Sequence, residues 1–230
     1  HNNLGLTLKE QGRLDESISS YVRAINLKAD FDNAYSNLGI ALKRARFAKG
    51  DQNLYPILIN LLTEKNFVRP QDVARAILSL LRLDKLIEDE LLSTKAFKDV
   101  KDVDLAINTL AQVPLLHHLM RICPLPDLQL EALFVSMRRL LLAGLGQIEA
   151  SPEITHFLST LSLHCFTNEY VYFETERETE LINLLEAAIA ERIAQASQPT
   201  ITETLILATY RPLHQYDWLE KLQVLDQLPE

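Results

Sequence analysis

Apolar residues recur every three or four positions along most of the chain, which is the spacing of amphipathic helices. In the first part of the chain this pattern predicts one helix over residues 1–10, a second over 14–28 and a third that begins at residue 31. The inward-facing residues of the second helix are predicted to be Ile18, Tyr21, Ala24, Ile25 and Leu27. Residues 48–53 are polar and include a glycine, so they predict a linker.

Helical spacing continues after the linker, and three of the later helix starts carry specific signals. Asp84 is expected to cap a short helix that ends near Leu92. Thr175 with Glu178, and Thr200 with Glu203, form the sequence pattern of a capping box. These signals place helix starts at three points of the chain after the linker.

The pattern as a whole predicts an all-α fold of about a dozen short helices. The helix after Thr175 is expected to turn five residues inward, namely Leu181, Leu184, Leu185, Ala188 and Ile189. A last helix is predicted over residues 216–228. The only candidate strand is 170–173, and it is too short to favour a strand over an irregular segment. We therefore expect two regions, 1–47 and an all-helical domain over 54–230.

One part of the pattern occurs twice, 34 residues apart. Leu4-Gly5 returns as Leu38-Gly39, and a turn glycine and a late small residue lie between them. A period of 34 with these features is the signature of the tetratricopeptide repeat, so residues 1–47 resemble one and a half such repeats. His1 falls where such a helix has an early aromatic residue, and we expect the chain to be a fragment of a longer protein. Such repeats stack into a groove that binds proteins and carry no chemistry.

The predicted groove contains an asparagine pair. Asn3 and Asn37 hold equivalent positions, and a side-chain amide can both donate to and accept from an extended peptide backbone. This arrangement resembles the asparagine ladder of the O-linked N-acetylglucosamine transferases. Lys43 and Arg44 lie two turns further on and are expected to attract an acidic ligand, whereas Ile40 departs from the polar clamp of chaperone-tail-binding repeats. The plain alternative is that asparagine is simply common at this position.

Composition narrows the class of partner. The net charge of −8 argues against a nucleic-acid binder, which usually has a basic face. Residues 1–50 hold 8 Lys/Arg and 5 Asp/Glu, so the acidic excess lies in the rest of the chain. No apolar run is long enough to span a bilayer, and two distant cysteines indicate a reducing cytoplasm. We expect a cytoplasmic protein with a protein or peptide partner; its oligomeric state is not predicted.

No motif predicts a metal site. His117-His118 lies near Cys123, and His164 precedes Cys165, but neither group has the CxxC or HxxxH spacing of metal ligands. We therefore expect no metal in this chain.

The hexamer 165–170 mixes polar groups with aromatic rings. A cysteine nucleophile needs an electropositive setting, and the surrounding glutamates make this stretch acidic. We interpret His164, Asn168, Glu169 and Tyr170 as a hydrogen-bonded junction that fixes the end of a helix, and we assign no catalytic residue.

Four short motifs resemble a larger family. Residues 67–74, 76–81, 165–171 and 210–213 are similar to the region that follows the repeats in bacterial tetratricopeptide proteins with a C-terminal S-adenosylmethionine-dependent methyltransferase domain. The resemblance implies that S-adenosylmethionine binds beyond residue 230 in the parent protein and that no cofactor binds here. Whether the parent protein is an enzyme is left open by this segment.

Three functions are compatible with these observations. The first is a non-catalytic scaffold that recruits a protein through the repeat groove, with Asn3 and Asn37 exposed side by side. The second is a helical domain that shapes the substrate site of a methyltransferase, with an uncovered apolar patch on 51–230. The third is an independent small-molecule site in the helical domain, with a closed pocket near His117, His164 or Asn168.

Overall fold

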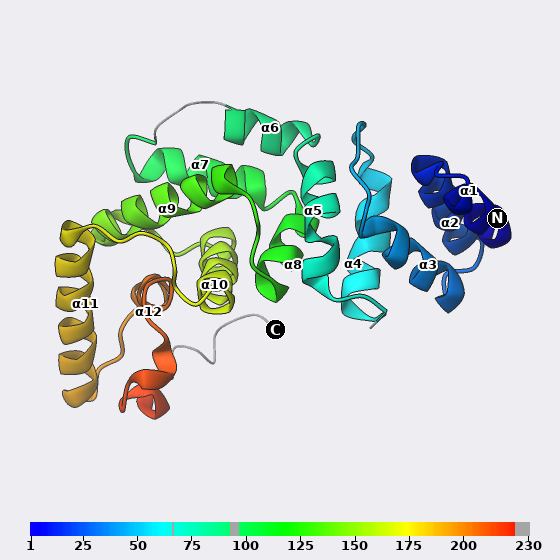
Figure 1. Ribbon diagram of the computed structural model, residues 1–230. Coiled ribbons are helices and arrows are strands. Elements are labelled where there is room, and N and C mark those ends of the chain that lie inside the picture. The colour runs from blue at the N-terminus through cyan, green and yellow to red at the C-terminus, as the bar shows by residue number, and fades with distance from the viewer. Residues whose placement is uncertain (66, 93–96, 224–230) are drawn as a thin grey trace. The chain divides into compact units, whose positions relative to one another are not determined.

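The computed structural model describes residues 1–65, 67–92 and 97–223, and within them it contains helices and no strand. The all-α prediction is therefore confirmed. The α-helices are α1 (Asn2–Glu10), α2 (Leu14–Leu27), α3 (Asp32–Leu42), α4 (Tyr55–Thr63), α5 (Pro70–Leu81), α6 (Lys85–Leu92), α7 (Val100–Leu110), α8 (Pro114–Ile122), α9 (Leu128–Ala143), α10 (Pro152–Thr167), α11 (Glu176–Ala194) and α12 (Ile201–Ala208) (Figure 1). Short 3-10 helices are η1 (Gln52–Leu54), η2 (Leu145–Gln147), η3 (Leu213–Gln215) and η4 (Leu219–Lys221).

The chain divides into two compact units. Unit 1 comprises His1–Leu92, Pro114–Leu119 and Leu125–Asp127, and unit 2 comprises Ser93–Val113, Met120–Pro124 and Leu128–Glu230. The linker predicted at residues 48–53 lies inside unit 1, so α4, α5 and α6 belong to the same unit as the repeat helices. The division into 1–47 and 54–230 stays a prediction about domains.

Helices α1, α2 and α3 pack on one another at the N-terminal end of unit 1 (Figure 1, blue). Gly5 lets α1 approach α2 closely, because a Cβ atom there would lie 2.5 Å from the ring of Tyr21. Ser17 donates a hydrogen bond to the Gly5 carbonyl at 2.7 Å across the same contact. Gly12 has a φ of +76° in the turn between the two helices, a conformation that glycine adopts without strain.

The second repeat departs from the first after α3. The period of 34 residues places its second helix from residue 48, because α2 begins at Leu14. The observed chain is not helical there: η1 begins at Gln52 and α4 at Tyr55. The close approach at Gly39 is made instead by Val68, whose Cγ1 would lie 2.2 Å from a Cβ atom on the glycine. One and a half repeats are therefore followed by a different arrangement.

Polar contacts link helices within unit 1. Asp84 caps α6 by accepting a hydrogen bond from the Leu86 amide at 3.0 Å, as predicted, and also accepts from the Tyr55 hydroxyl at 2.6 Å. The Lys65 ammonium group bonds Asp32 at 2.7 Å and lies over the Tyr35 ring, which ties the end of α4 to α3.

Unit 2 has its core where α9 and α10 meet α7 and α12, with α11 packed on α9 and α12. The fully buried side chains there include Val103, Ile107, Phe134, Met137, Phe157, Leu161 and Leu207. The capping boxes at Thr175–Glu178 and Thr200–Glu203 are both formed and begin α11 and α12, as predicted.

Three of the helical predictions are corrected by the structure. Leu184 and Leu27, both predicted to face inward, are 66% and 72% exposed. The buried stripe of α11 is Ile182, Leu185, Ile189 and Ile193. From residue 216 to 223 the chain forms only η4, so the helix predicted from residue 216 does not begin there, and residues 224–228 of that prediction lie outside the described residues.

Candidate functional site

The face of α1 and α3 carries the predicted groove residues, and its asparagines pair differently from the prediction. The Asn37 side-chain amide donates to the side-chain oxygen of Asn2 at 3.0 Å. Asn3 is exposed, and its backbone carbonyl accepts a hydrogen bond from the Thr7 hydroxyl. The prediction placed Asn3 beside Asn37, but the side chain that contacts Asn37 is that of the preceding residue, Asn2. The sequence signal was present in the doublet Asn2-Asn3, but the 34-residue period selected the second member.

The other residues predicted for this groove are Ile40, Lys43 and Arg44, and they differ in exposure and charge pairing. Ile40 is 48% exposed at the middle of α3. Lys43 forms an ion pair with Asp72 at 2.8 Å, so its charge is already matched within unit 1. Arg44 is exposed and has no ion-pair partner among the described residues. An acidic ligand would thus meet Arg44 more readily than Lys43.

Equivalent leucines differ sharply in burial. Leu38 is 1% exposed, whereas Leu4, one period earlier, is 52% exposed. Of the exposed apolar side chains, Ile40 lies one turn after Asn37 on α3 and adds apolar surface beside the amides, whereas Leu4 is two positions from Asn2 and lies on another side of α1. Apolar side chains beside a few well-placed polar groups are typical of surfaces that bind other proteins.

Residues 1–45 match the family model of the TPR repeat. They are a TPR-type region. Repeats of this kind generally mediate interactions between proteins, as the groove predicted from the sequence implied. No curated protein and no solved structure matches the chain significantly. Of the helices described, none is both long and apolar enough to cross a membrane.

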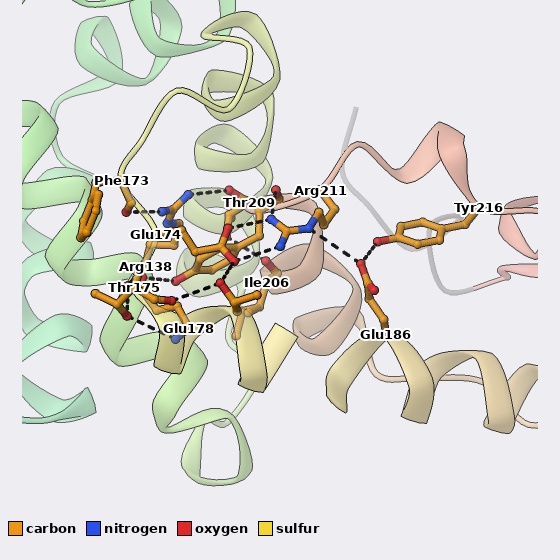
Figure 2. A network of polar contacts seen from close by, with 12 residues as sticks. Arg138, Phe173, Glu174, Thr175, Glu178, Glu186, Ile206, Thr209, Arg211 and Tyr216 are labelled. Atoms are coloured by element: carbon orange, nitrogen blue, oxygen red, sulfur yellow. Dashed lines mark hydrogen bonds and ion pairs between the residues drawn. The ribbon is translucent and has the colours of Figure 1, made fainter. Parts of the chain in front are cut away.

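A second polar cluster lies in unit 2, outside the TPR region, and centres on Arg138 of α9 (Figure 2). The Arg138 side chain is buried, and its two terminal nitrogens donate to the backbone carbonyls of Phe173 and Thr209 at 3.1 and 3.2 Å. The guanidinium carbon lies 3.9 Å from the centre of the Tyr210 ring, a cation–π contact. One side chain thus joins segments that are 35 and 71 residues away from it.

Glu178, in the first turn of α11, is a buried carboxylate whose oxygens are fully used. It accepts hydrogen bonds from the amide and hydroxyl of Thr175, from the Tyr210 hydroxyl and from Arg139. Burial alone would raise the pKa of Glu178, but the hydrogen bonds from Thr175, Tyr210 and Arg139 together outweigh it and lower the pKa. The carboxylate is therefore held ionised and matched.

Arg211 and Glu174 form a two-bond ion pair at the edge of the same cluster. The two terminal nitrogens of Arg211 reach the two carboxylate oxygens of Glu174 at 2.7 and 2.9 Å. Glu186 lies beside Arg211 and accepts a hydrogen bond from the Tyr216 hydroxyl. Figure 2 shows these residues linking the segment before α11 to the segment after α12.

The predicted junction residues lie at the end of α10. His164 is fully buried, and its Nδ1 lies 3.1 Å from the carbonyl of Met120 while its Nε2 lies 2.8 Å from the Tyr172 hydroxyl. Because a carbonyl only accepts, Nδ1 carries the proton and Nε2 accepts from the tyrosine. Burial lowers the pKa of His164, partly opposed by the Met120 carbonyl.

Asn168, Glu169 and Tyr170 then turn the chain sharply. Asn168 caps α10 and its carbonyl accepts from the Val171 amide, while Glu169 and Tyr170 have φ values of +53° and +55°. The Tyr170 hydroxyl donates to the Ala208 carbonyl at 3.3 Å. Successive non-glycine residues at positive φ are uncommon and are kept only where the surroundings hold them. The role of these four residues as a purely structural junction stays a prediction.

Neither a reactive thiol nor a set of metal ligands is found among the described residues of unit 2. Burial raises the pKa of the Cys165 thiol to about 12, against a small opposing effect of Arg138, so the thiol is not poised as a nucleophile. Among the residues that the structure describes, no three His, Cys, Asp or Glu side chains come together in a way that could hold a metal ion. The TPR face, with the half-buried amides of Asn2 and Asn37 and the exposed Asn3, is the stronger candidate for function.

Proposed function

We propose that this chain is a non-catalytic interaction scaffold that binds an extended segment of a partner protein on the face of α1 and α3. The observation that carries the proposal is the Asn37–Asn2 contact, which presents side-chain amides on a face that also carries the exposed Ile40, one turn after Asn37 on α3. An amide that is half satisfied by another amide keeps one donor and one acceptor for a ligand.

The charge on this face also supports a protein ligand. Because Lys43 is paired with Asp72, Arg44 is the cation left for a partner carboxylate. A single exposed cation sets orientation and contributes little affinity. Amides that contact a peptide backbone and apolar side chains that contact its side chains are therefore expected to dominate binding.

The test is a selection of random dodecapeptides displayed on messenger RNA, first on the wild-type chain and then on variants. We expect enriched peptides to lose affinity by about tenfold or more on Asn37→Ala and on Ile40→Asp. The matched control is Lys28→Ala, an exposed residue beyond the end of α2. Peptides that bind wild type and the Asn37→Ala and Ile40→Asp variants equally would contradict the proposal.

We propose further that the parent protein carries a methyltransferase domain for which this chain recruits a partner or shapes access to the substrate. The motif resemblance supports this context, as do the exposed apolar side chains of unit 2 that are available for contact, such as Leu128, Val171 and Phe173. Its test is an S-adenosylmethionine titration of a chain extended beyond residue 230: saturable heat supports the methyltransferase context, and no heat contradicts it.

A further inference from the structure

A hollow lies beside α2. Some of its lining residues belong to the segment from residue 48 onward, which the TPR period predicts to be helical. Its volume is about 470 Å³, within the range of ligand-binding clefts. One wall is α2 and the other is made by residues of the segment 47–54. In a continued repeat the second helix would begin at residue 48, but here the chain is coil until η1. Part of the wall opposite α2 is thus coil at positions where a continued repeat would place the first turns of a helix.

The α2 wall has helical spacing from end to end. Its lining residues include Asp15, Ile18, Val22, Arg23 and Asn26. They span three turns of one helix face, or about 16 Å at 1.5 Å per residue. The hollow is therefore elongated along the α2 axis, and a helix is the shape that packs along such a stripe.

The floor is apolar and the ends of the α2 wall carry opposite charges. Ile18 and Leu54 are buried at the base, with Val22 and Phe47 half-buried above them. Asp15 lies in the first turn of α2 and Arg23 two turns later, and neither has an ion-pair partner in the described part of the chain.

The opposite wall is electrically balanced. It adds Lys49 and Asp51, one charge of each sign, and Asp51 already accepts hydrogen bonds from Asn53. The charge polarity of the hollow is therefore set by Asp15 and Arg23 on α2.

We propose that this hollow binds an amphipathic helix of a partner protein, about three turns long, seated along α2. The helix places its apolar stripe on Ile18, Val22 and Phe47, a basic side chain at Asp15 and an acidic side chain at Arg23. This site lies on α2 and is separate from the face of α1 and α3 proposed above, so either site can fail without the other.

The experiment uses two synthetic peptides of about 14 residues, locked as helices by a hydrocarbon staple and carrying the same leucine stripe. One has lysine near its N-terminus and glutamate eight positions later, the spacing of Asp15 and Arg23. The other has these two charges exchanged. Fluorescence polarisation on the full chain measures both affinities at low salt, because exposed charges are screened at high salt.

The expected result is a preference of about fivefold or more for one peptide, which also reports the direction of the bound helix. The charge-exchanged protein, Asp15→Lys with Arg23→Glu, is expected to prefer the other peptide. Val22→Asp is expected to weaken both by about tenfold or more. The matched control, Glu10→Lys on α1, leaves both affinities unchanged, and circular dichroism confirms that each variant keeps its helices.

Other outcomes overturn the proposal. Binding of neither peptide at millimolar concentration removes the site. Equal binding of an unstapled peptide broken by a central proline shows that the hollow takes an extended chain. Affinity that falls on Asn37→Ala and not on Val22→Asp places the peptide on the face of α1 and α3. If the charge-exchanged protein prefers the same peptide as wild type, Asp15 and Arg23 do not select the bound helix by its charges.

Discussion

Gly39 packs closely against Val68, and this contact is equivalent to the one between Gly5 and Tyr21 one repeat earlier. In each pair the glycine lacks the Cβ atom that would overlap its partner, at 2.2 Å from Val68 and 2.5 Å from Tyr21. The partner of Gly5 comes from the next helix, whereas the partner of Gly39 comes from the segment between α4 and α5. The second repeat thus keeps its glycine contact although the following helix is not in register.

Gly39→Ala is expected to destabilise the chain by about 1–3 kcal/mol. Alanine favours a helix interior by up to about 1 kcal/mol over glycine, but the overlap with Val68 is expected to outweigh this gain. Chemical denaturation followed by circular dichroism measures the change in free energy of unfolding.

Adding Val68→Ala should restore part of that loss, since it removes the overlapping Cγ1 atom. Gly146→Ala is the control, because a Cβ atom there meets nothing within 4 Å. Strict additivity of the Gly39 and Val68 changes would mean that the two residues do not contact each other.

Arg138→Lys is expected to cost about 1–3 kcal/mol of stability. A single ammonium group cannot reproduce the two divergent hydrogen bonds to Phe173 and Thr209 or the stacking on Tyr210. Urea denaturation measures the loss. Arg177→Lys, at an exposed ion pair of α11, should change stability by less than about 0.5 kcal/mol. An equal effect of the two substitutions would show that the buried contacts contribute nothing.

Glu178 should make stability depend on pH in the acid range. Its folded pKa lies below the ordinary value of 4.5, so its contribution is complete above that pH and is lost as the pH falls through the folded pKa. Glu178→Gln is expected to cost about 1–3 kcal/mol at pH 7 and progressively less below pH 4.5. The measurement is urea denaturation from pH 7 to pH 3, with Glu220→Gln as an exposed control. A constant difference across this range would exclude the assigned pKa shift.

The two cysteines are expected to be inert in the folded chain. Both are buried, and burial raises the pKa of Cys123 to about 11 and that of Cys165 to about 12. A disulfide-exchange reagent at pH 8 should therefore label neither thiol until urea is added, after which both react. Rapid labelling of either thiol in native buffer would show that its surroundings open readily.

S-adenosylmethionine should not bind to this chain. In unit 2 the buried carboxylate of Glu178 and the two terminal nitrogens of Arg138 already have hydrogen-bond partners within the chain. Isothermal calorimetry on the 230-residue chain is expected to give no saturable heat, with a known methyltransferase as the positive control. Saturable heat would replace the scaffold proposal with a binding site inside the chain.

Local signals in the sequence were sufficient wherever a structure depends on neighbouring residues. The capping boxes at Thr175 and Thr200, the Asp84 cap and the ends of α1 and α2 were predictable because their partners lie within a few positions. The TPR period was also readable, since it requires only equivalent residues 34 positions apart.

Features that depend on distant packing were not predictable. Arg138 gave no signal, because its carbonyl partners are 35 and 71 residues away. Leu184 was assigned inward because α11 has two overlapping apolar stripes, and only the packing of α9 and α12 selects the one with Ile182. The choice between Asn2 and Asn3 likewise depends on how α1 and α3 are rotated against each other.

The attachment of Phe173 and Thr209 to one guanidinium has a consequence for how unit 2 opens. The segment before α11 and the end of α12 are held by the same side chain. If Arg138 moves away when one of them opens, the carbonyl of the other loses its hydrogen-bond donor. They are expected to behave as one cooperative unit in native-state hydrogen exchange, with the hydrogen-bonded amides of Val171 and Tyr210 protected to the same degree. A region of irregular backbone would in this way share the opening free energy of the helices that surround it.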